Sequence, residues 1–243
     1  MNKALNKYQS IWLKDVFEPY IIKNPNASIS YPFFLGVSEK YENATKRIMI
    51  VGQETRGWTL YKPDWTLEDS QKWTIDYLNY QLHYDDSLRE RFGRRNSSPF
   101  WSFFKQFSND DIVPCWNNID KAQRYFDGKT MSLTEEIEFA LNKSLPNSNK
   151  TLFQMEIDIT KPDVIVFITG PCYYATMEAA MNLEKDSLKN VGLSYNHGCV
   201  DITNTVNLGV PTYWTYHPRH IASKKNELCR NDIVKTIKKG FNI

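Results

Sequence analysis

Three apolar segments of this sequence, far apart along the chain, each lead into side chains that could carry out acid–base chemistry. A carboxylate can stabilise a cation or orient a water molecule, and an imidazole can donate to an oxygen atom that gains negative charge. An amide offers both a donor and an acceptor to a ligand. The residues concerned are Gln53 and Glu54, Asn117 and Asn118, and His217 with Arg219 and His220. If the segments are parallel strands, their carboxyl ends share the edge of the sheet where ligands bind, so the pattern predicts a site there.

Continuous apolar runs predict the strands that must position these side chains. The runs lie at residues 47–51, 111–118, 163–170 and 210–216, and residues 198–203 are a candidate edge strand. Runs without polar alternation are typical of strands covered on both faces, as in a parallel sheet between helical layers. We therefore predict a single α/β domain over residues 1–243. It is a three-layer αβα sandwich with a central, mainly parallel four-stranded sheet, on which residues 1–44 pack as an N-terminal helical extension.

Helices are predicted between the strands from capping patterns and periodicity. Thr66 followed by Asp69, and Ser132 followed by Glu135, match the capping box that begins a helix. Residues 9–23 have apolar positions at helical spacing, and Pro19 predicts a break in this helix. Further helices are predicted at residues 99–107, 151–161, 171–184 and 227–239.

Composition excludes several classes of protein. The net charge is +2, so no strong attraction to a polyanion follows from the total, although a local basic groove can still exist. The four cysteines are widely spaced and contain no CxxC pair, which argues against a disulfide framework or a zinc site and favours a reducing compartment. The N-terminus lacks the apolar core of a signal peptide, and no window approaches 18 apolar residues. We expect a soluble, cytoplasmic protein without membrane contact, and no obligate protein partner is evident.

Four short motifs resemble the uracil-DNA glycosylase superfamily when they are taken in order. The stretch IVGQETRGW resembles the first motif of that superfamily, whose best-known form is GQDPYH, and YHPRHI resembles its histidine-proline motif. Between them, CWNNIDK is similar to the asparagine segment that ends a strand, and DVIVFITG to the strand before the third crossover. Together the four motifs span residues 45–225, so the resemblance covers most of the chain.

The resemblance implies the roles of two catalytic residues. Cleaving a base from deoxyribose passes through an oxocarbenium-like sugar. Glu54 occupies the position of the aspartate in GQDPYH and is one methylene longer, and it would stabilise this cation and orient the attacking water. His217 matches the histidine that donates to the carbonyl oxygen of the departing base. The expected protein is a monofunctional DNA glycosylase that acts in base excision, for DNA repair or for phage defence, without a metal, iron–sulfur cluster or organic cofactor.

The resemblance also implies a pocket for a base extruded from duplex or single-stranded DNA. Asn118, or its neighbour Asn117, would pair with the polar edge of the base, and Phe100 would offer a stacking face. Gln53 would act mainly through its backbone. Arg56 replaces the tyrosine with which the superfamily excludes thymine. The expected substrate is therefore uracil or a modified pyrimidine, for instance a bulky one in phage DNA.

DNA contacts are expected beside this pocket. Ile221 stands where the superfamily inserts an apolar wedge into the minor groove, which helps to hold a vacated base stack open. The expected phosphate contacts are basic residues in three segments: Arg219 and His220, Lys224, and Arg94 and Arg95.

Each of these assignments has a simpler alternative. Glu54 could form a cap or a salt bridge near Arg56, and His217 could bond only to the backbone. The asparagines could be turn residues, the aromatic residues around Phe100 could belong to the core, and the basic clusters could be solvated. Two other functions also remain open. One is a nucleic-acid-binding protein of the same fold that lacks the chemistry, and the other is a hydrolase or binder of small nucleotides.

Overall fold

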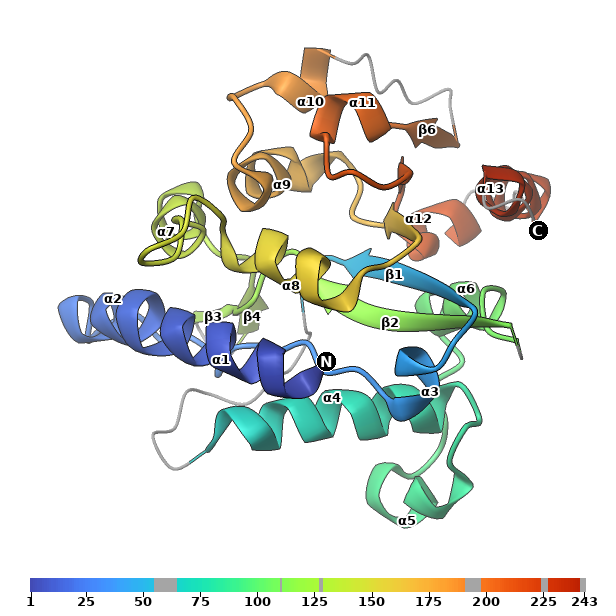
Figure 1. Cartoon of the computed structure of the whole chain (residues 1–243), viewed down its shortest axis with the longest axis horizontal. Coiled ribbons are helices and arrows are strands. Elements are labelled where there is room, and N and C mark those ends of the chain that lie inside the picture. The colour runs from blue at the N-terminus through green and yellow to red at the C-terminus, as the bar shows by residue number, and fades with distance from the viewer. Residues whose placement is uncertain (55–64, 110, 127–128, 191–197, 224–226, 241–243) are drawn as a thin grey trace.

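The computed structural model describes residues 1–54, 65–109, 111–126, 129–190, 198–223 and 227–240. Their centre is a sheet with the strand order β2-β1-β5-β7-β6, which crosses the middle of Figure 1. Its strands are β1 (Lys46–Gly52), β2 (Ile112–Asn118), β5 (Val164–Phe167), β6 (Cys199–Asp201) and β7 (Thr212–Thr215). A separate antiparallel pair consists of β3 (Arg124–Phe126) and β4 (Lys129–Met131).

The central sheet is mainly parallel, which confirms the predicted α/β class. β1 pairs in parallel with β2 and β5, and β5 pairs in parallel with β7. The predicted count of four strands is wrong, because β6 pairs antiparallel with β7 and adds a fifth strand at the edge. β2, β5 and β7 are buried along their whole length, as continuous apolar runs require.

Helices cover both faces of the sheet, an arrangement compatible with three layers. On one face α8 (Leu152–Thr160) lies in front of β1 and β2 in Figure 1, and α1 (Asn2–Trp12) contacts α8. On the other face α6 (Pro99–Lys105) packs through Trp101 on Trp116 of β2, with ring centroids 5.2 Å apart. α12 (Pro218–Ser223) contacts α6 and therefore lies on the same side.

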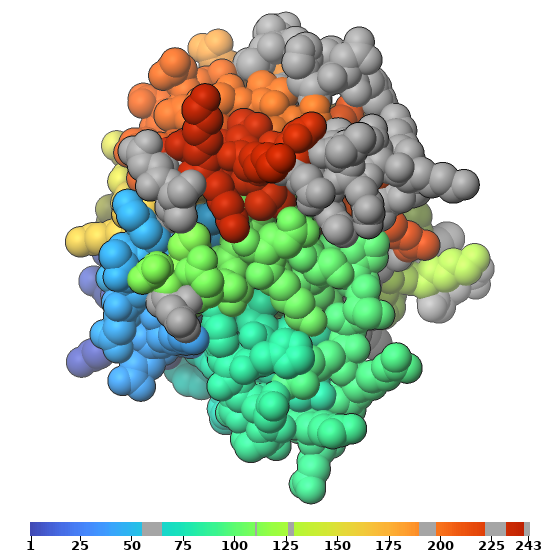
Figure 2. Space-filling model, turned by 90° about the vertical axis from the view of Figure 1, so that its right-hand side faces the viewer, coloured from blue at the N-terminus to red at the C-terminus, as the bar shows by residue number. Residues whose placement is uncertain are grey.

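The remaining helices lie around these layers. They are α2 (Glu18–Lys23), α3 (Glu39–Glu42), α4 (Leu67–Gln81), α5 (Arg89–Phe92), α7 (Glu135–Leu141), α9 (Tyr174–Met181), α10 (Ser187–Asn190), α11 (Thr203–Val206) and α13 (Glu227–Gly240). Short 3-10 turns occupy Asp86–Leu88 (η2) and Pro171–Tyr173 (η3). Figure 2 shows the side on which the green segment around α6 and the start of β2 separates α13, in red, from α4 and α5, in teal. Within the described residues, none of the helices is long and apolar enough to cross a bilayer.

The N-terminal segment stays helical through its proline. A π-helical turn (Leu13–Phe17) joins α1 to α2, and Pro19 lies in the first turn of α2. The predicted break there is wrong, because the chain stays helical, and the regular α-helical bonding that a proline cannot complete is replaced by the π-helical turn just before it. Trp12 anchors α1 by donating from Nε1 to the carbonyl oxygen of Leu141 at 2.8 Å. The N-terminal helix is thus tied to α7.

One of the two predicted capping boxes is confirmed. The Thr66 hydroxyl accepts from the backbone N–H of Asp69 at 3.1 Å, and the Asp69 carboxylate accepts from the backbone N–H of Thr66. The box predicted at Ser132 is wrong, because Thr134 is the N-cap of α7. The Ser132 hydroxyl instead lies 3.2 Å from the phenol oxygen of Tyr173. Sequence spacing alone does not show which of two nearby hydroxyls meets the helix end.

Candidate functional site

The strand order places a switch point at the carboxyl ends of β1 and β5. The chain runs from β1 to β2 on one side and later to β5 and β7 on the other, and open α/β sheets bind ligands where the order reverses in this way. Gln53 and Glu54 follow β1 at this edge, and His217 follows β7. Gln53 donates from Nε2 to the carbonyl oxygen of Thr169, beyond β5, at 2.6 Å. This bond fixes the turn after β1 against the neighbouring strand end.

A cavity of about 730 Å³ opens at this edge. Its volume falls within the roughly 300–1,000 Å³ of small-molecule sites. The polar part of its lining includes Gln53, Glu54, His217, Arg219 and His220, and the aromatic part includes Trp73, Tyr77, Phe100, Trp101 and Trp116. A carboxylate, imidazoles and a broad aromatic wall therefore face one space, although they come from β1, α4, α6, β2 and the segment after β7.

The carboxylate of Glu54 is held from behind by a tyrosine. Tyr173, at the end of η3, donates from its phenol to Oε2 of Glu54. Asp120 is close by, because its backbone N–H donates to the carbonyl oxygen of Gln53 at 3.0 Å. The alternative in which Glu54 caps a helix is not what the described contacts show.

Two buried acids lie near Glu54, and both have raised pKa values. Burial is the largest cause of the raised pKa of Asp120, and the negative charges of Glu138 and Glu54 raise it further. Burial likewise raises the pKa of Glu138 to about 8, and the charge of Glu54 adds to this. Sequence reasoning missed Tyr173, Asp120 and Glu138. A carboxylate in a helix such as α7 has the same local pattern whether it faces solvent or the interior.

The imidazole of His217 is oriented by the first turn of α12. Its Nδ1 accepts a hydrogen bond from the backbone N–H of Arg219 at 3.2 Å. In a neutral ring the proton then lies on Nε2, which can donate. The ring of Phe100 is nearly parallel to that of His217, at 22°, with the centroids 6.0 Å apart. His217 and Phe100 thus form one side of the cavity.

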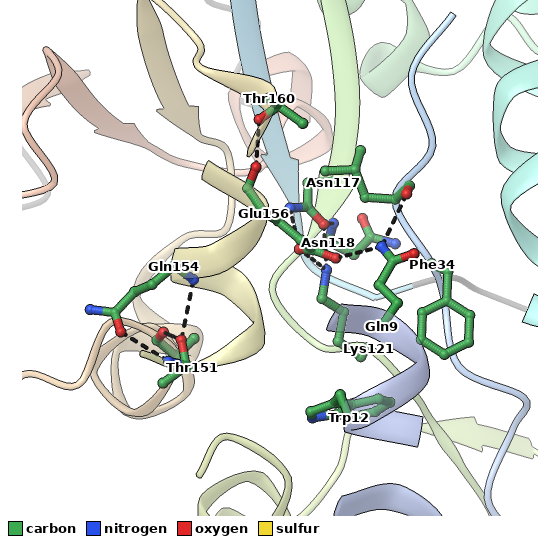
Figure 3. Close-up of polar contacts among 12 residues, drawn as sticks. Gln9, Trp12, Phe34, Asn117, Asn118, Lys121, Thr151, Gln154, Glu156 and Thr160 are labelled. Carbon is green, nitrogen blue, oxygen red and sulfur yellow. Dashed lines mark hydrogen bonds and ion pairs between the residues drawn. The ribbon is translucent and has the colours of Figure 1, made fainter. Parts of the chain in front are cut away.

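The two asparagines at the end of β2 point in opposite directions. Asn118 is buried beside the aromatic wall, and its Oδ1 accepts from Nε1 of Trp116 at 2.9 Å. Asn117 donates from Nδ2 to Oε2 of Glu156 at 2.9 Å and accepts from Nζ of Lys121 at 2.6 Å (Figure 3). Successive strand residues face opposite sides of a sheet. The assignment of Asn117 to base binding is therefore wrong, while Asn118 lies on the cavity side.

Gly52 allows the side chains of Asn118 and Phe100 to lie close to the end of β1. A Cβ atom on Gly52 would lie 2.7 Å from Oδ1 of Asn118 and 3.1 Å from Cε2 of Phe100. The side chains of Asn118 and Phe100 therefore occupy the space that a side chain at position 52 would need. Phe100 is partly buried against the core and lines the cavity at the same time, so the two interpretations of this residue are not exclusive.

Two of the expected DNA contacts are already engaged within the protein. Ile221 is only 5% exposed and belongs to the hydrophobic core, so its expected role as an exposed wedge is wrong in this conformation. The helical turn of α12 points its side chain inward. Arg95 donates from Nε to the carbonyl oxygen of Tyr80 at 2.7 Å and pairs with Asp86, so it acts as a structural residue instead of a phosphate contact.

The other expected contacts have mixed outcomes. Arg219 and His220 are exposed and line the cavity, and Arg94 is exposed on the loop after α5. Arg56 and Lys224 lie outside the described residues, and their predicted roles stay predictions. Among the residues that the structure describes, no group of three or more histidine, cysteine, aspartate or glutamate side chains is arranged to hold a metal ion.

The fold and the site define an α/β protein with a ligand-sized cavity at the carboxyl edge of a mainly parallel sheet. A scan against protein-family models finds no match to this chain, and a search of curated proteins finds none either. The inference of function therefore depends on the four motifs and on the geometry of the cavity.

Proposed function

We propose that this protein is a monofunctional DNA glycosylase of the uracil-DNA glycosylase type. The observation that carries the proposal is that Glu54 and His217, which are far apart in the sequence, line one cavity at the switch point of the sheet. These are the two side chains to which the motif resemblance gives catalytic roles. That these two side chains line the same cavity is an observation separate from the similarity of the motifs.

The chemistry that we propose is hydrolysis through a sugar cation. The bond between C1′ of the deoxyribose and the base nitrogen breaks, and its electron pair leaves with the base. Glu54 stabilises the resulting cation and orients a water molecule that attacks C1′. His217 donates from Nε2 to the carbonyl oxygen that carries the negative charge of the base. The products are a free base and an abasic site, and the proton released by water ends on the base or in solvent.

The cavity supports binding of a base that has been rotated out of the stack. Phe100 offers an aromatic face, and the buried amide of Asn118 lies next to it. Gln53 stays fixed to Thr169 and holds the turn. We propose uracil or a modified pyrimidine as the base, since the cavity of about 730 Å³ has room for substituents on the ring.

The proposal is tested by an abasic-site assay on a panel of duplex and single-stranded DNAs. The panel carries uracil, hypoxanthine, hydroxymethylated cytosine and glucosylated cytosine. Against the best substrate, Glu54→Gln and His217→Ala should each lower kcat by about 100- to 1,000-fold, the usual effect of removing one group that stabilises transition-state charge. Asp158→Asn, a change in an exposed ion pair, serves as the control. Equal rates in the parent and both site variants would refute the proposal.

A binder or hydrolase of small nucleotides is the second candidate. The observation in its favour is that Ile221 and Arg95, two expected DNA contacts, are engaged inside the protein. Duplex binding that neutralises phosphates weakens steeply with salt, with a slope of about −0.9 per phosphate contact on logarithmic axes. A slope near zero, together with binding of free nucleotides, would favour this candidate. Steep salt dependence without abasic product would indicate a nucleic-acid-binding protein that lacks the chemistry.

A further inference from the structure

Behind Glu54 lies a cluster of polar side chains that the proposed chemistry does not use, and all of them except Ser132 are buried. The Tyr173 phenol donates to Oε2 of Glu54, and the Ser132 hydroxyl lies 3.2 Å from the same phenol oxygen. Asp120, two residues after β2, and Glu138 of α7 are next to this group and only 1% and 4% exposed. Four separate segments thus place polar side chains behind one carboxylate of the cavity.

Each of the two buried acids has one carboxyl oxygen without a hydrogen-bond donor among the described residues. Asn142 donates from Nδ2 to Oε2 of Glu138 at 3.0 Å. Neither Oδ1 of Asp120 nor Oε1 of Glu138 receives a hydrogen bond from the described residues. Asp120 and Glu138 nevertheless lie close enough to bond to each other. Because a carboxylate cannot donate, such a bond requires a proton on one of the two acids.

The electrostatic surroundings favour that proton. The charged groups that act on Asp120 are the carboxylates of Glu138 and Glu54, and the Thr176 hydroxyl is a neutral partner. Burial first, and these like charges second, hold the pKa of Asp120 well above its usual range, and the pKa of Glu138 rises to about 8. Ionising both of two adjacent buried acids near neutral pH has a high free-energy cost. The pair therefore keeps at least one proton there.

We propose that Tyr173 is the positioning residue for Glu54, and that the buried acids Asp120 and Glu138 behind it share a proton. The catalytic part of this inference rests on the proposed function of Glu54. The phenol acts as a neutral donor, since burial and the charge of Glu54 raise the pKa of Tyr173 far above neutrality.

The extra methylene of Glu54 has a physical reason in this arrangement. An aspartate at position 54 would carry its carboxylate closer to the backbone, away from the Tyr173 phenol. The longer side chain reaches the phenol and also lines the cavity. The contact therefore couples the length of residue 54 to the identity of residue 173.

A double-mutant cycle tests the contact. Tyr173→Phe should lower kcat by about 10- to 100-fold, the effect of losing a hydrogen bond to a charged group, with little change in KM. It should also move the acidic limb of the pH–kcat profile to higher pH. Glu54→Asp should have a similar effect, and the double variant should be no slower than the slower single variant. The control is Tyr174→Phe, in which a neighbouring ring that packs on Trp214 loses its hydroxyl. A Tyr173→Phe variant that behaves like this control, or effects that multiply in the double variant, would overturn the inference.

Two readouts need no substrate and separate this inference from the proposed function. The first readout is the midpoint of urea unfolding of the parent, Tyr173→Phe, Glu54→Asp and the double variant. The midpoints should show coupling between positions 54 and 173, and shifts in midpoint that simply add in the double variant would contradict the contact. At pH 7 the parent should show the infrared stretch of a protonated carboxyl group, and Asp120→Asn/Glu138→Gln should lose it. A parent without this band, or a double variant that keeps it, would overturn the proton on the pair. A parent that releases no base but passes both tests would refute the glycosylase and leave the cluster as described.

Discussion

Asn117 and Asn118 are adjacent at the end of β2, yet their side chains lie on opposite faces of the central sheet. Asn117 bonds to Glu156 and Lys121 under α8 (Figure 3). Asn118 bonds to Trp116 beside the cavity. The alternation of side chains along a strand separates them. One asparagine therefore belongs to the interior and its neighbour to the candidate site.

This relationship predicts that the two asparagines differ in what they control. Asn118→Ala should lower base release by about 10- to 100-fold, since the variant lacks the buried amide that we propose pairs with the base. Asn117→Ala should lower the free energy of unfolding by about 1–3 kcal/mol, because Lys121 and Glu156 each lose a buried partner. Urea unfolding and the abasic-site assay measure the two effects. If Asn117→Ala were as stable as the parent and as inactive as Asn118→Ala, the assignment of faces would be wrong.

The buried ion pair under α8 should dominate the stability of this face. Lys121 and Glu156 are 6% and 1% exposed, with Nζ and Oε2 2.7 Å apart. Lys121→Met should cost about 3–5 kcal/mol, because it leaves the Glu156 carboxylate buried without its cation. Lys150→Met breaks the exposed pair with Asp158 and should cost less than about 1 kcal/mol. Similar unfolding free energies for the two variants would contradict this prediction.

Gly52 should not tolerate a side chain. Gly52→Ala places a Cβ against Oδ1 of Asn118, which Trp116 holds in place, so we expect a loss of about 1–3 kcal/mol from overpacking and reduced base release. Gly93→Ala is the comparison, since no atom lies within 4 Å of a Cβ there and only its positive φ of 68° opposes the change. That variant should lose some stability but keep the parent kcat. Unchanged stability and kcat in Gly52→Ala would show that the site is looser than described.

Stability should fall with rising pH because of Glu138. Its pKa is about 8 in the folded protein against an ordinary value of 4.5, so the folded state binds more protons than the unfolded state between these pH values. The free energy of unfolding then decreases as pH rises from about 4.5 to 8 and levels off above, by at most about 1.4 kcal/mol per pH unit for one such group. Asp120 and Glu54 also affect the pKa of Glu138.

Glu138→Gln removes the group that causes this decrease. Urea unfolding at intervals between pH 5 and 8 should give a flatter dependence in Glu138→Gln than in the parent. Glu136→Gln changes an exposed carboxylate of the same helix and should keep the parent slope. An identical slope in all three proteins would mean that Glu138 ionises normally.

Local patterns predicted the elements well where one strong signal decided them. The apolar run before Gly52, the capping box at Thr66 and the strand before Gly170 are each set by neighbouring residues, and the structure contains β1, α4 and β5 at these places. The sequence also placed Glu54 and His217 at strand ends. It could not decide between Ser132 and Thr134 as a cap, because both have the same chemistry within one turn.

What the sequence determined by itself is therefore the places of the buried strands and the polar residues that follow them, since apolar continuity and turn residues are local properties. Only the tertiary structure decided that Asn118 packs beside Trp116 of the cavity wall, that Ile221 is buried and that Tyr173 holds Glu54. These outcomes depend on strand pairing and on helix orientation. Both are set by contacts between segments distant in sequence, which no local pattern encodes.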